Sequence, residues 1–184
     1  VMALGLNATF QTLLFNLPGA VDASFVSKEN FTINSPWLES AKQRFSSAVY
    51  KQPVWTMGTP ESNPNREKYW SPAYFGGKDK GVLVTAAAPV YATDDFRGVV
   101  LIDTSLDYLN RINSDFGYRP GTVFLVDAFG AVLAHPDMLA DGLETKETRT
   151  MASVVPPALA GDSAPLTALA RGVPSEVDGY LVIR

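Results

Sequence analysis

Residues 81–103 read GVLVTAAAPVYATDDFRGVVLID, in which two apolar, β-branched runs enclose the polar turn ATDD. The runs 81–91 and 96–103 each predict a β-strand, because such residues favour strands and turn residues bound them. Both runs are apolar on both faces over part of their length, which is typical of central strands covered on two sides. We therefore expect a hairpin at the centre of a sheet.

The sequence before this hairpin predicts a helix, a further hairpin and a long loop. Residues 10–17 carry apolar side chains at helical spacing and end before a Pro-Gly pair. In residues 21–34 apolar positions alternate with polar ones such as Asp22, which predicts a half-buried hairpin. Residues 36–50 carry a short helical pattern. Residues 52–65 are rich in Pro, Gly, Ser, Thr and Asn and predict a long loop, a kind of segment that often carries function.

The sequence after the central hairpin predicts a connecting helix and a second sheet. Residues 104–116, TSLDYLNRINSDF, have helical periodicity, with Thr104 and Asp107 as a capping pattern at the start. Residues 122–136, TVFLVDAFGAVLAHP, predict another hairpin with a tight turn at 127–130. The other expected elements are short helical pieces at 155–160 and 166–171 and a closing strand at 179–184.

This order of elements predicts an α+β protein of two modules, each an antiparallel sheet with helices beside it. The first module covers residues 1–117 and includes the N-terminal and connecting helices. The second covers residues 118–184. Because the chain begins at Val1 and its last strand stops abruptly, we expect an excised fragment whose second module is truncated or continues beyond the residues given.

Composition excludes several classes of function. The 184 residues carry a formal net charge of −4, which argues against binding nucleic acid or an anionic membrane surface. The absence of cysteine excludes disulfides, thiolate catalysis and cysteine metal sites. No stretch reaches the roughly 18–20 apolar residues that a membrane span needs.

The candidate binding residues gather in NREKYWSPAYF, residues 65–75. Arg66 is surrounded in sequence by Tyr69, Trp70 and Tyr74. Three interpretations are open: a solvated loop, a structural cation–π contact, and a guanidinium that holds a carboxylate in an aromatic-walled pocket. For any single aromatic residue here, including Trp55 and Tyr91, a place in the core is the more frequent outcome.

Asp103 is a candidate of a different kind, because it ends an otherwise apolar strand. Strand alternation places it on the same face as Val99 and Leu101, so we expect a partly buried carboxylate that needs a partner. It could cap the following helix, but Thr104 already suits that role. Asp103 is therefore available for a cationic group.

Catalysis and metal binding have little support in the sequence. His135 is the only histidine, and a zinc site usually needs about four ligands with more histidine or cysteine. No Asp or Glu pair has a spacing suited to acid–base catalysis. Residues 75–81, FGGKDKG, match no phosphate-binding loop and predict a turn. We predict no cofactor and no metal.

Four motifs in fixed order give the chain a family resemblance. YWSPAYF, APVY, FRGVVLIDTSL and VDAFGAVLAHP resemble the double-Cache family, the tandem PAS-like extracytoplasmic domains of bacterial histidine kinases, diguanylate cyclases and chemoreceptors. The resemblance covers roughly residues 18–137. It implies two PAS-like modules, of which the membrane-distal one binds a small molecule and the membrane-proximal one relays the signal.

The resemblance also implies roles for individual residues. In amino-acid-binding members an Arg contacts the ligand carboxylate, and a later Tyr and a strand-terminal Asp face the amine. Arg66, Tyr74 and Asp103 occupy those places, although the aromatic pair in REKYW is reversed and shifted and Glu61 stands where the family has a Tyr. The expected ligand-binding set is Arg66, Tyr69, Trp70, Tyr74, Asp103, Trp55 and Tyr91.

The function expected from these patterns is that of a non-enzymatic, periplasmic sensing domain of a bacterial receptor. Its partner would be a small anionic or zwitterionic molecule, such as an amino acid or organic acid, and not nucleic acid. The resemblance implies flanking transmembrane helices in the full-length protein and allows a homodimer. The alternatives are a free-standing small-ligand-binding protein and, with less support, a small hydrolase.

Overall fold

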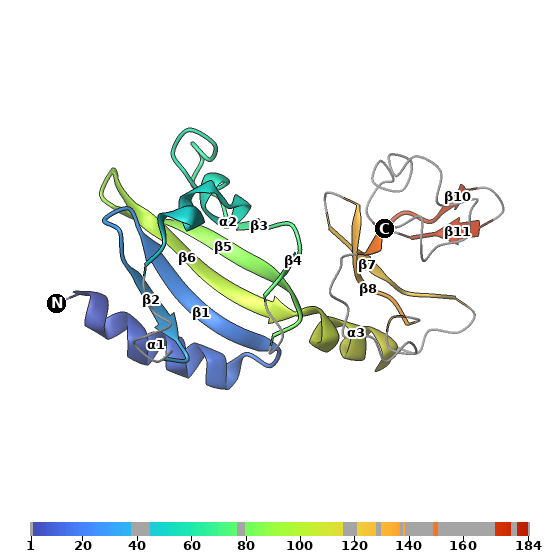
Figure 1. The fold of residues 1–184 in the computed structure, drawn as a ribbon. Coiled ribbons are helices and arrows are strands. Elements are labelled where there is room, and N and C mark those ends of the chain that lie inside the picture. Colours follow the sequence, from blue (N-terminus) through green and yellow to red (C-terminus); the bar gives the residue numbers. More distant parts are fainter. Residues whose placement is uncertain are drawn as a thin grey trace. The chain divides into compact units, whose positions relative to one another are not determined.

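The computed structural model describes residues 2–37, 45–76, 80–115, 121–127, 130–136, 138, 149–150, 172–177 and 180–183 (Figure 1). Two compact units can be separated by their internal contacts: Val1–Tyr108 and Leu109–Arg184. The expected division between residues 117 and 118 lies outside the described residues. The prediction of an α+β fold with antiparallel sheets is confirmed.

A six-stranded antiparallel sheet forms the first unit, with the order β2-β1-β6-β5-β3 and β4 also paired to β5 (Figure 1). Both predicted hairpins are present, and the strands over 81–91 and 96–103 are internal strands of the sheet, as expected. The strands are β1 (Ala20–Ser27), β2 (Thr32–Ser35), β3 (Tyr69–Trp70), β4 (Tyr74–Phe75), β5 (Val82–Ala92) and β6 (Asp95–Ser105).

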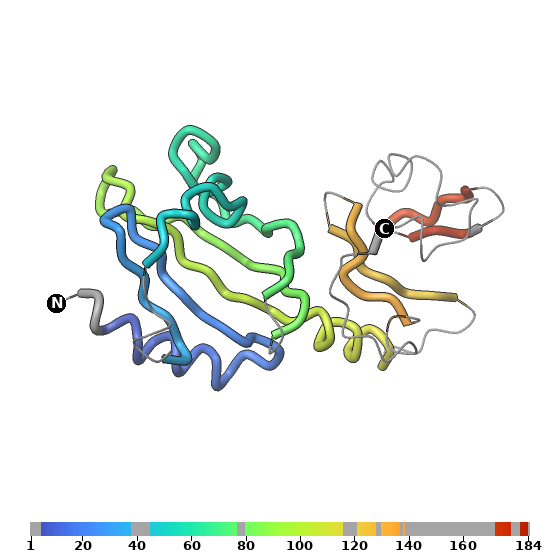
Figure 2. Tube along the Cα trace, viewed as in Figure 1, coloured from blue at the N-terminus to red at the C-terminus, as the bar shows by residue number. Residues whose placement is uncertain are grey.

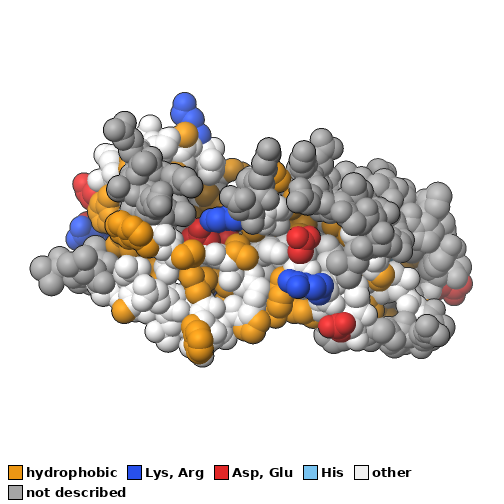
Figure 3. Space-filling model, turned by 60° about the horizontal axis from the view of Figure 1, so that its bottom comes forward, with side chains coloured by type: hydrophobic (Ala, Val, Ile, Leu, Met, Phe, Trp, Pro, Cys, Tyr) orange, Lys and Arg blue, Asp and Glu red, His pale blue; other side chains and the backbone are white. Residues whose placement is uncertain are grey.

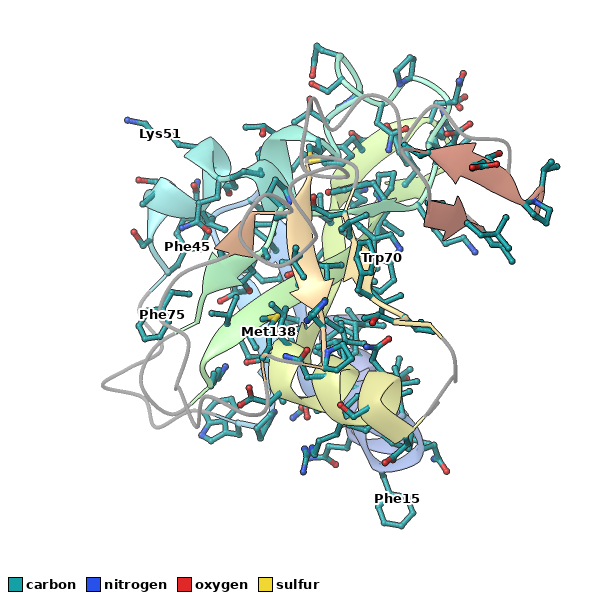
Figure 4. The ribbon with its side chains drawn as sticks, turned by 90° about the vertical axis from the view of Figure 1, so that its right-hand side faces the viewer. Phe15, Phe45, Lys51, Trp70, Phe75 and Met138 are labelled. Atoms are coloured by element: carbon teal, nitrogen blue, oxygen red, sulfur yellow. The ribbon has the colours of Figure 1, made fainter. Side chains whose placement is uncertain are left out.

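Helix α1 (Met2–Asn16) lies along one face of this sheet, beside β1 and β2 (Figure 2). It begins eight residues before the predicted Phe10 start. Phe10 is buried with Ala23 and Phe25, and this small core holds the helix on the sheet. Phe15 is 89% exposed and points away from the unit (Figure 4). With the α1 side turned forward, Figure 3 shows hydrophobic patches separated by few charged side chains.

The opposite face of the sheet is covered by the 3-10 helix η1 (Ser47–Lys51) and helix α2 (Pro53–Thr56). The prediction of a long loop over 52–65 is wrong at its start, where residues 53–56 form α2 because Pro53 favours a first helical turn. Of the helical pattern predicted for 36–50, residues 38–44 lie outside the described part. The buried residues of this second core are Val26, Val54, Ala87, Val99 and Leu101, and the partly buried ones packed on them are Phe45, Val49, Tyr50, Trp55, Tyr69 and Phe96.

Helix α3 (Leu106–Asp115) begins directly after β6, close to the predicted position. Its cap is Ser105, whose Oγ accepts a hydrogen bond from Tyr108 N at 3.2 Å. The prediction of Thr104 as the cap is therefore wrong by one residue. Thr104 lies within β6, where its register partner is Val84, so its backbone still belongs to the sheet.

The second unit has two small antiparallel sheets in its described part. One has the order β7-β8-β9 and the other is the pair β10-β11. The predicted turn at 127–130 is present, with Gly130 N donating to Asp127 O and Gly130 at φ 84°, a conformation that suits glycine. The pieces expected at 155–160 and 166–171 lie outside the described residues. The strands are β7 (Leu125–Val126), β8 (Ala131–Ala134), β9 (Arg149–Thr150), β10 (Ser175–Val177) and β11 (Tyr180–Val182).

Two buried asparagines of α3 attach that helix to the second unit. Asn110 Oδ1 accepts a hydrogen bond from His135 N at 2.9 Å, and Asn113 Nδ2 donates to Val123 O at 2.7 Å. Both asparagine side chains are almost fully buried. The only histidine of the chain is therefore part of the packing between α3 and the sheet that contains β8.

Candidate functional site

The structure separates the predicted site residues into two groups at different ends of β5. Arg66, Trp55 and Tyr91 lie near the β5–β6 turn, whereas Tyr74 and Asp103 lie near the other end of the hairpin. Thr85, the register partner of Asp103, is six residues before Tyr91. At roughly 3.3 Å per residue, their Cα atoms are about 20 Å apart. The structure does not bring Arg66 and Asp103 together.

Arg66 holds the loop after α2 against the β5–β6 turn. Its Nη2 pairs with Asp94 Oδ1 at 2.9 Å, its Nη1 donates to Thr93 O at 3.3 Å, and its guanidinium carbon lies 4.1 Å from the centroid of the Tyr91 ring. Arg66 also has a positive φ of 58°, an uncommon backbone conformation for a residue other than glycine. Of the three interpretations, these contacts match the structural cation–π contact.

The Arg66→Ala variant separates a structural role from a ligand-anchoring role. Both side chains of the Arg66–Asp94 pair are well exposed, at 44% and 86%, so we expect a loss of only about 1 kcal/mol in the free energy of unfolding. The affinity for a small zwitterionic ligand, measured by calorimetry, should change less than threefold. A tenfold or larger loss would instead support the ligand-anchoring role, which stays a prediction.

Trp55 and Tyr69 are packed into the α2 side of the sheet. The Trp55 ring lies 4.5 Å from that of Tyr50 and 5.5 Å from that of Phe96, between centroids. The Tyr69 hydroxyl donates to Val54 O at 2.7 Å, and burial raises the pKa of Tyr69 to about 12. These contacts are those of core residues.

An open pocket of about 350 Å³ lies beside Tyr69. Its wall comes from α2 and the loop that follows it, and it carries both a carboxylate and an ammonium group. Trp70, on β3 at the edge of the sheet, is 57% exposed (Figure 4). The pocket residues are Thr56, Met57, Ser62, Asn63, Glu67, Lys68 and Tyr69.

Asp103 belongs to a group of polar residues on the α2 face of the sheet, called the polar cluster below: Asp22, Tyr74, Lys80, Thr85 and Asp103. Asp22, Asp103 and Thr85 are direct register partners across β1, β6 and β5, so they form one row on one face. Tyr74 comes from β4, and Lys80 from the turn between β4 and β5.

Short hydrogen bonds connect the polar cluster. Thr85 Oγ1 donates to Asp103 Oδ1 at 2.5 Å and lies 3.3 Å from the Tyr74 hydroxyl. Lys80 Nζ pairs with Asp22 Oδ2 at 2.5 Å. Thr85 is fully buried, and Asp22 is only 8% exposed. The cluster therefore places two carboxylates side by side on the α2 face of the sheet.

Burial dominates the electrostatics of this cluster. It raises the pKa of the Asp103 carboxyl above its ordinary 3.8, and the neighbouring Asp22 adds to this effect, while the Thr85 and Tyr74 hydroxyls and Lys80 oppose it. Burial also raises the pKa of the Tyr74 phenol, with the Asp103 carboxylate as the next cause. The expectation of a partly buried Asp103 on the face of Val99 and Leu101 is confirmed.

Sequence reasoning missed Asp22, Thr85 and Lys80. Alternation in 21–34 predicts one buried and one solvent-facing side, which places Asp22 in solvent. The strand β1 is instead internal, and both of its faces are covered. The available signal was the apolar character of the strands on the same sheet, which predicts burial on two sides.

Other kinds of site find no support in the part of the chain that the structure describes. Within those residues, no group of three or more His, Cys, Asp or Glu side chains is placed to hold a metal ion. No helix among them has the length and apolarity needed to cross a membrane.

The fold is shared with several solved sensor domains, although no protein-family model and no curated protein matches the sequence. One is the extracellular domain of a candidate histidine kinase, with a TM-score of 0.63 at 14% identity, covering 91% of this chain and 65% of that one. A second is the ligand-binding domain of the Pseudomonas aeruginosa amino-acid chemoreceptor PctC in complex with GABA, with a TM-score of 0.56 at 15% identity, covering 83% and 61%.

A third is the ligand-binding domain of the Pseudomonas fluorescens chemoreceptor CtaA in complex with L-serine, with a TM-score of 0.56 at 17% identity, covering 83% of this chain and 63% of that one. The chain thus spans less than two thirds of the length of each of these structures. The predicted α+β fold class with antiparallel sheets is confirmed, and these solved sensor domains share that fold.

Proposed function

We propose that this chain is the extracytoplasmic sensing domain of a bacterial signal-transduction receptor, and that it binds a small zwitterionic molecule through the ammonium group of that molecule. The observation that carries the proposal is Asp103, a partly buried carboxylate near the end of an internal strand. Hydroxyl groups are its hydrogen-bond partners, and the ammonium group of Lys80 is paired with Asp22.

Burying a carboxylate is costly unless a partner compensates it. The fold places that cost on the sheet face that α2 covers, beside Tyr74 and fully buried Thr85. A ligand ammonium would supply the missing counter-charge, and its hydrogen bonds to a charged acceptor would be worth about 1.5–3 kcal/mol each. If Asp103 had only a structural role, nothing would compensate the free-energy cost of burying its charge in this way.

The fold neighbours support this class of ligand. PctC was solved with GABA and CtaA with L-serine, and both compounds carry a primary ammonium and a carboxylate. In our proposal this chain does no chemistry itself and is held at the membrane by transmembrane helices of the complete receptor. Its ligand set is Asp103 and Tyr74, whereas Trp70 pairs with Ala86 and so faces the other side of the sheet from Thr85 and Asp103.

A free-standing ligand-binding protein is the alternative, and the sequence of the complete gene separates the two. Membrane-spanning segments on both sides of this chain, followed by a kinase, cyclase or chemotaxis output domain, would support the receptor. Their absence would favour the free-standing protein without affecting the binding site.

A thermal-shift screen tests the proposed ligand class. The panel contains amino acids, 4-aminobutanoate, simple amines, and organic acids that lack an amine. At a concentration of 100 times Kd, a ligand stabilises the folded state by about 2.7 kcal/mol, which is a shift of several degrees. We expect stabilisation by ammonium compounds alone. Stabilisation by amine-free acids alone would contradict the proposal.

A further inference from the structure

Asp22 is the least satisfied carboxylate of the polar cluster. Its Oδ2 pairs with Lys80, but its Oδ1 is buried and has no hydrogen-bond partner. The residue is 8% exposed, so solvent does not replace the missing partner. A buried acceptor without a donor costs about 1–3 kcal/mol. An unpartnered oxygen in this position indicates a donor that arrives from outside the chain.

A β-bulge directs Asp22 toward Asp103. Ala20 pairs with Thr104, whereas Asp22 pairs with Asp103, so Val21 is an extra residue on β1. Bulges of this kind re-aim the side chains that follow them and are frequent next to functional sites. The Cβ atoms of directly opposed residues are about 4.5–5.5 Å apart, and like charges so placed destabilise the sheet. The strand pairing therefore forces two carboxylates together at a cost to the fold.

The charges of the polar cluster do not balance among the described residues. Asp22 and Asp103 contribute −2 and Lys80 contributes +1, which leaves −1. One additional positive charge would neutralise the cluster, whereas two would leave it with a net positive charge. The unpartnered oxygen of Asp22 and the charge deficit of the cluster both suit one additional ammonium group.

We propose that Asp22 is the second carboxylate of the ammonium site and that Lys80 is its internal counter-ion, so that the site selects ligands with a single primary ammonium. This inference rests on the proposed function of Asp103. A primary ammonium has three N–H donors, and Asp22 Oδ1, the Asp103 carboxylate and the Tyr74 hydroxyl are the acceptors that the polar cluster offers to them. A trimethylammonium group has no N–H and would leave Asp22 Oδ1 without a partner.

The roles of Asp22 and Lys80 predict opposite effects for two variants. Lys80→Met removes the internal competitor, so the affinity for a primary ammonium should rise about tenfold. The double variant Asp22→Asn with Lys80→Met keeps the net charge of −1 but loses one charged acceptor, so affinity should fall about tenfold below that of the unaltered protein. A merely structural ion pair would not increase affinity when it is removed.

The experiment is calorimetric titration of the unaltered protein, Lys80→Met, the double variant and Asp103→Asn with L-leucine, 4-aminobutanoate and butylamine. Each probe is compared with its N-trimethyl derivative, which should bind at least tenfold more weakly, and thermal melts confirm that every variant is folded. The inference is overturned, with the proposed function intact, if Asp103→Asn abolishes binding while the Lys80→Met and double variants match the unaltered protein. If no primary ammonium probe binds the unaltered protein, the inference and the proposed function are both wrong.

Discussion

Asp103→Asn is expected to lower the affinity for a primary ammonium ligand by roughly ten- to hundredfold, and to make the ligand-free protein more stable. The loss follows because an amide replaces a charged acceptor, whose hydrogen bonds are worth about 1.5–3 kcal/mol. The gain in stability follows because burial, which raises the pKa of Asp103, makes the ionised carboxylate less favourable in the folded state than in the unfolded state. We expect roughly 0.5–2 kcal/mol, the usual size of a single stabilising substitution.

The pH dependence of this gain has a definite sign. A carboxyl with a raised pKa in the folded state stabilises the protein most below its unfolded pKa, near 3.8, and that contribution is lost as pH rises through the folded pKa. The stability advantage of Asp103→Asn should therefore be largest at neutral pH and shrink on acidification. The affinity of the unaltered protein for the ligand should rise as pH increases through the folded pKa of Asp103, because the ammonium needs the ionised carboxylate.

Asp95→Asn is the matched control on the same strand. Asp95 is exposed, and its hydrogen bond with Lys28 lowers its pKa below 3.8. Removing this charge should slightly lower stability at neutral pH, the opposite sign to Asp103→Asn, and leave ligand affinity unchanged. Denaturant unfolding between pH 4 and pH 8 measures both variants. Equal stability changes in the two variants would show that burial does not set the pKa of Asp103.

Gly98→Ala is expected to have the largest effect on the fold, a loss of about 3 kcal/mol or more in the free energy of unfolding. Gly98 has a φ of 149°, and a Cβ at this position would lie 2.0 Å from Val26 O. That oxygen belongs to the backbone of β1, so relief of the clash would separate two internal strands. Backbone strain combined with overpacking is among the mechanisms that produce the large single-site effects.

Gly5→Ala is the control for this substitution. Gly5 lies inside α1, and a Cβ there would meet no atom within 4 Å. Alanine is favoured over glycine in a helix interior by roughly 0.5–1 kcal/mol, so this variant should be slightly more stable. Chemical denaturation of the two variants compares them. If Gly98→Ala were as stable as the unaltered protein, the close pairing of β1 and β6 would be wrong.

The strands and helices could be predicted from the sequence because their signals are local. The apolar runs of 81–103 specify β5 and β6, and their lack of alternation indicated an internal position in the sheet. The position of Asp103 followed from the same periodicity. The start of α3 was misplaced by one cap residue, since Thr104 and Ser105 are both good caps and only the end of the strand pairing selects between them.

The candidate site could be predicted only in part because its contacts join distant segments. Lys80 and Asp22 are 58 residues apart in sequence, and Arg66 and Asp94 are 28 apart. No local pattern encodes such pairs. An aromatic cluster around an arginine suits a pocket wall and a loop contact equally well, and the separation of Arg66 from Asp103 depends on where the loop meets the hairpin.

A crystal structure of the domain with the tightest-binding primary ammonium compound of the screen tests the central claim most directly. Our account predicts the ammonium nitrogen within about 3 Å of an Asp103 carboxylate oxygen, which is hydrogen-bond distance. An ammonium bound elsewhere, for example in the open pocket beside Tyr69 with Asp103 untouched, would contradict it.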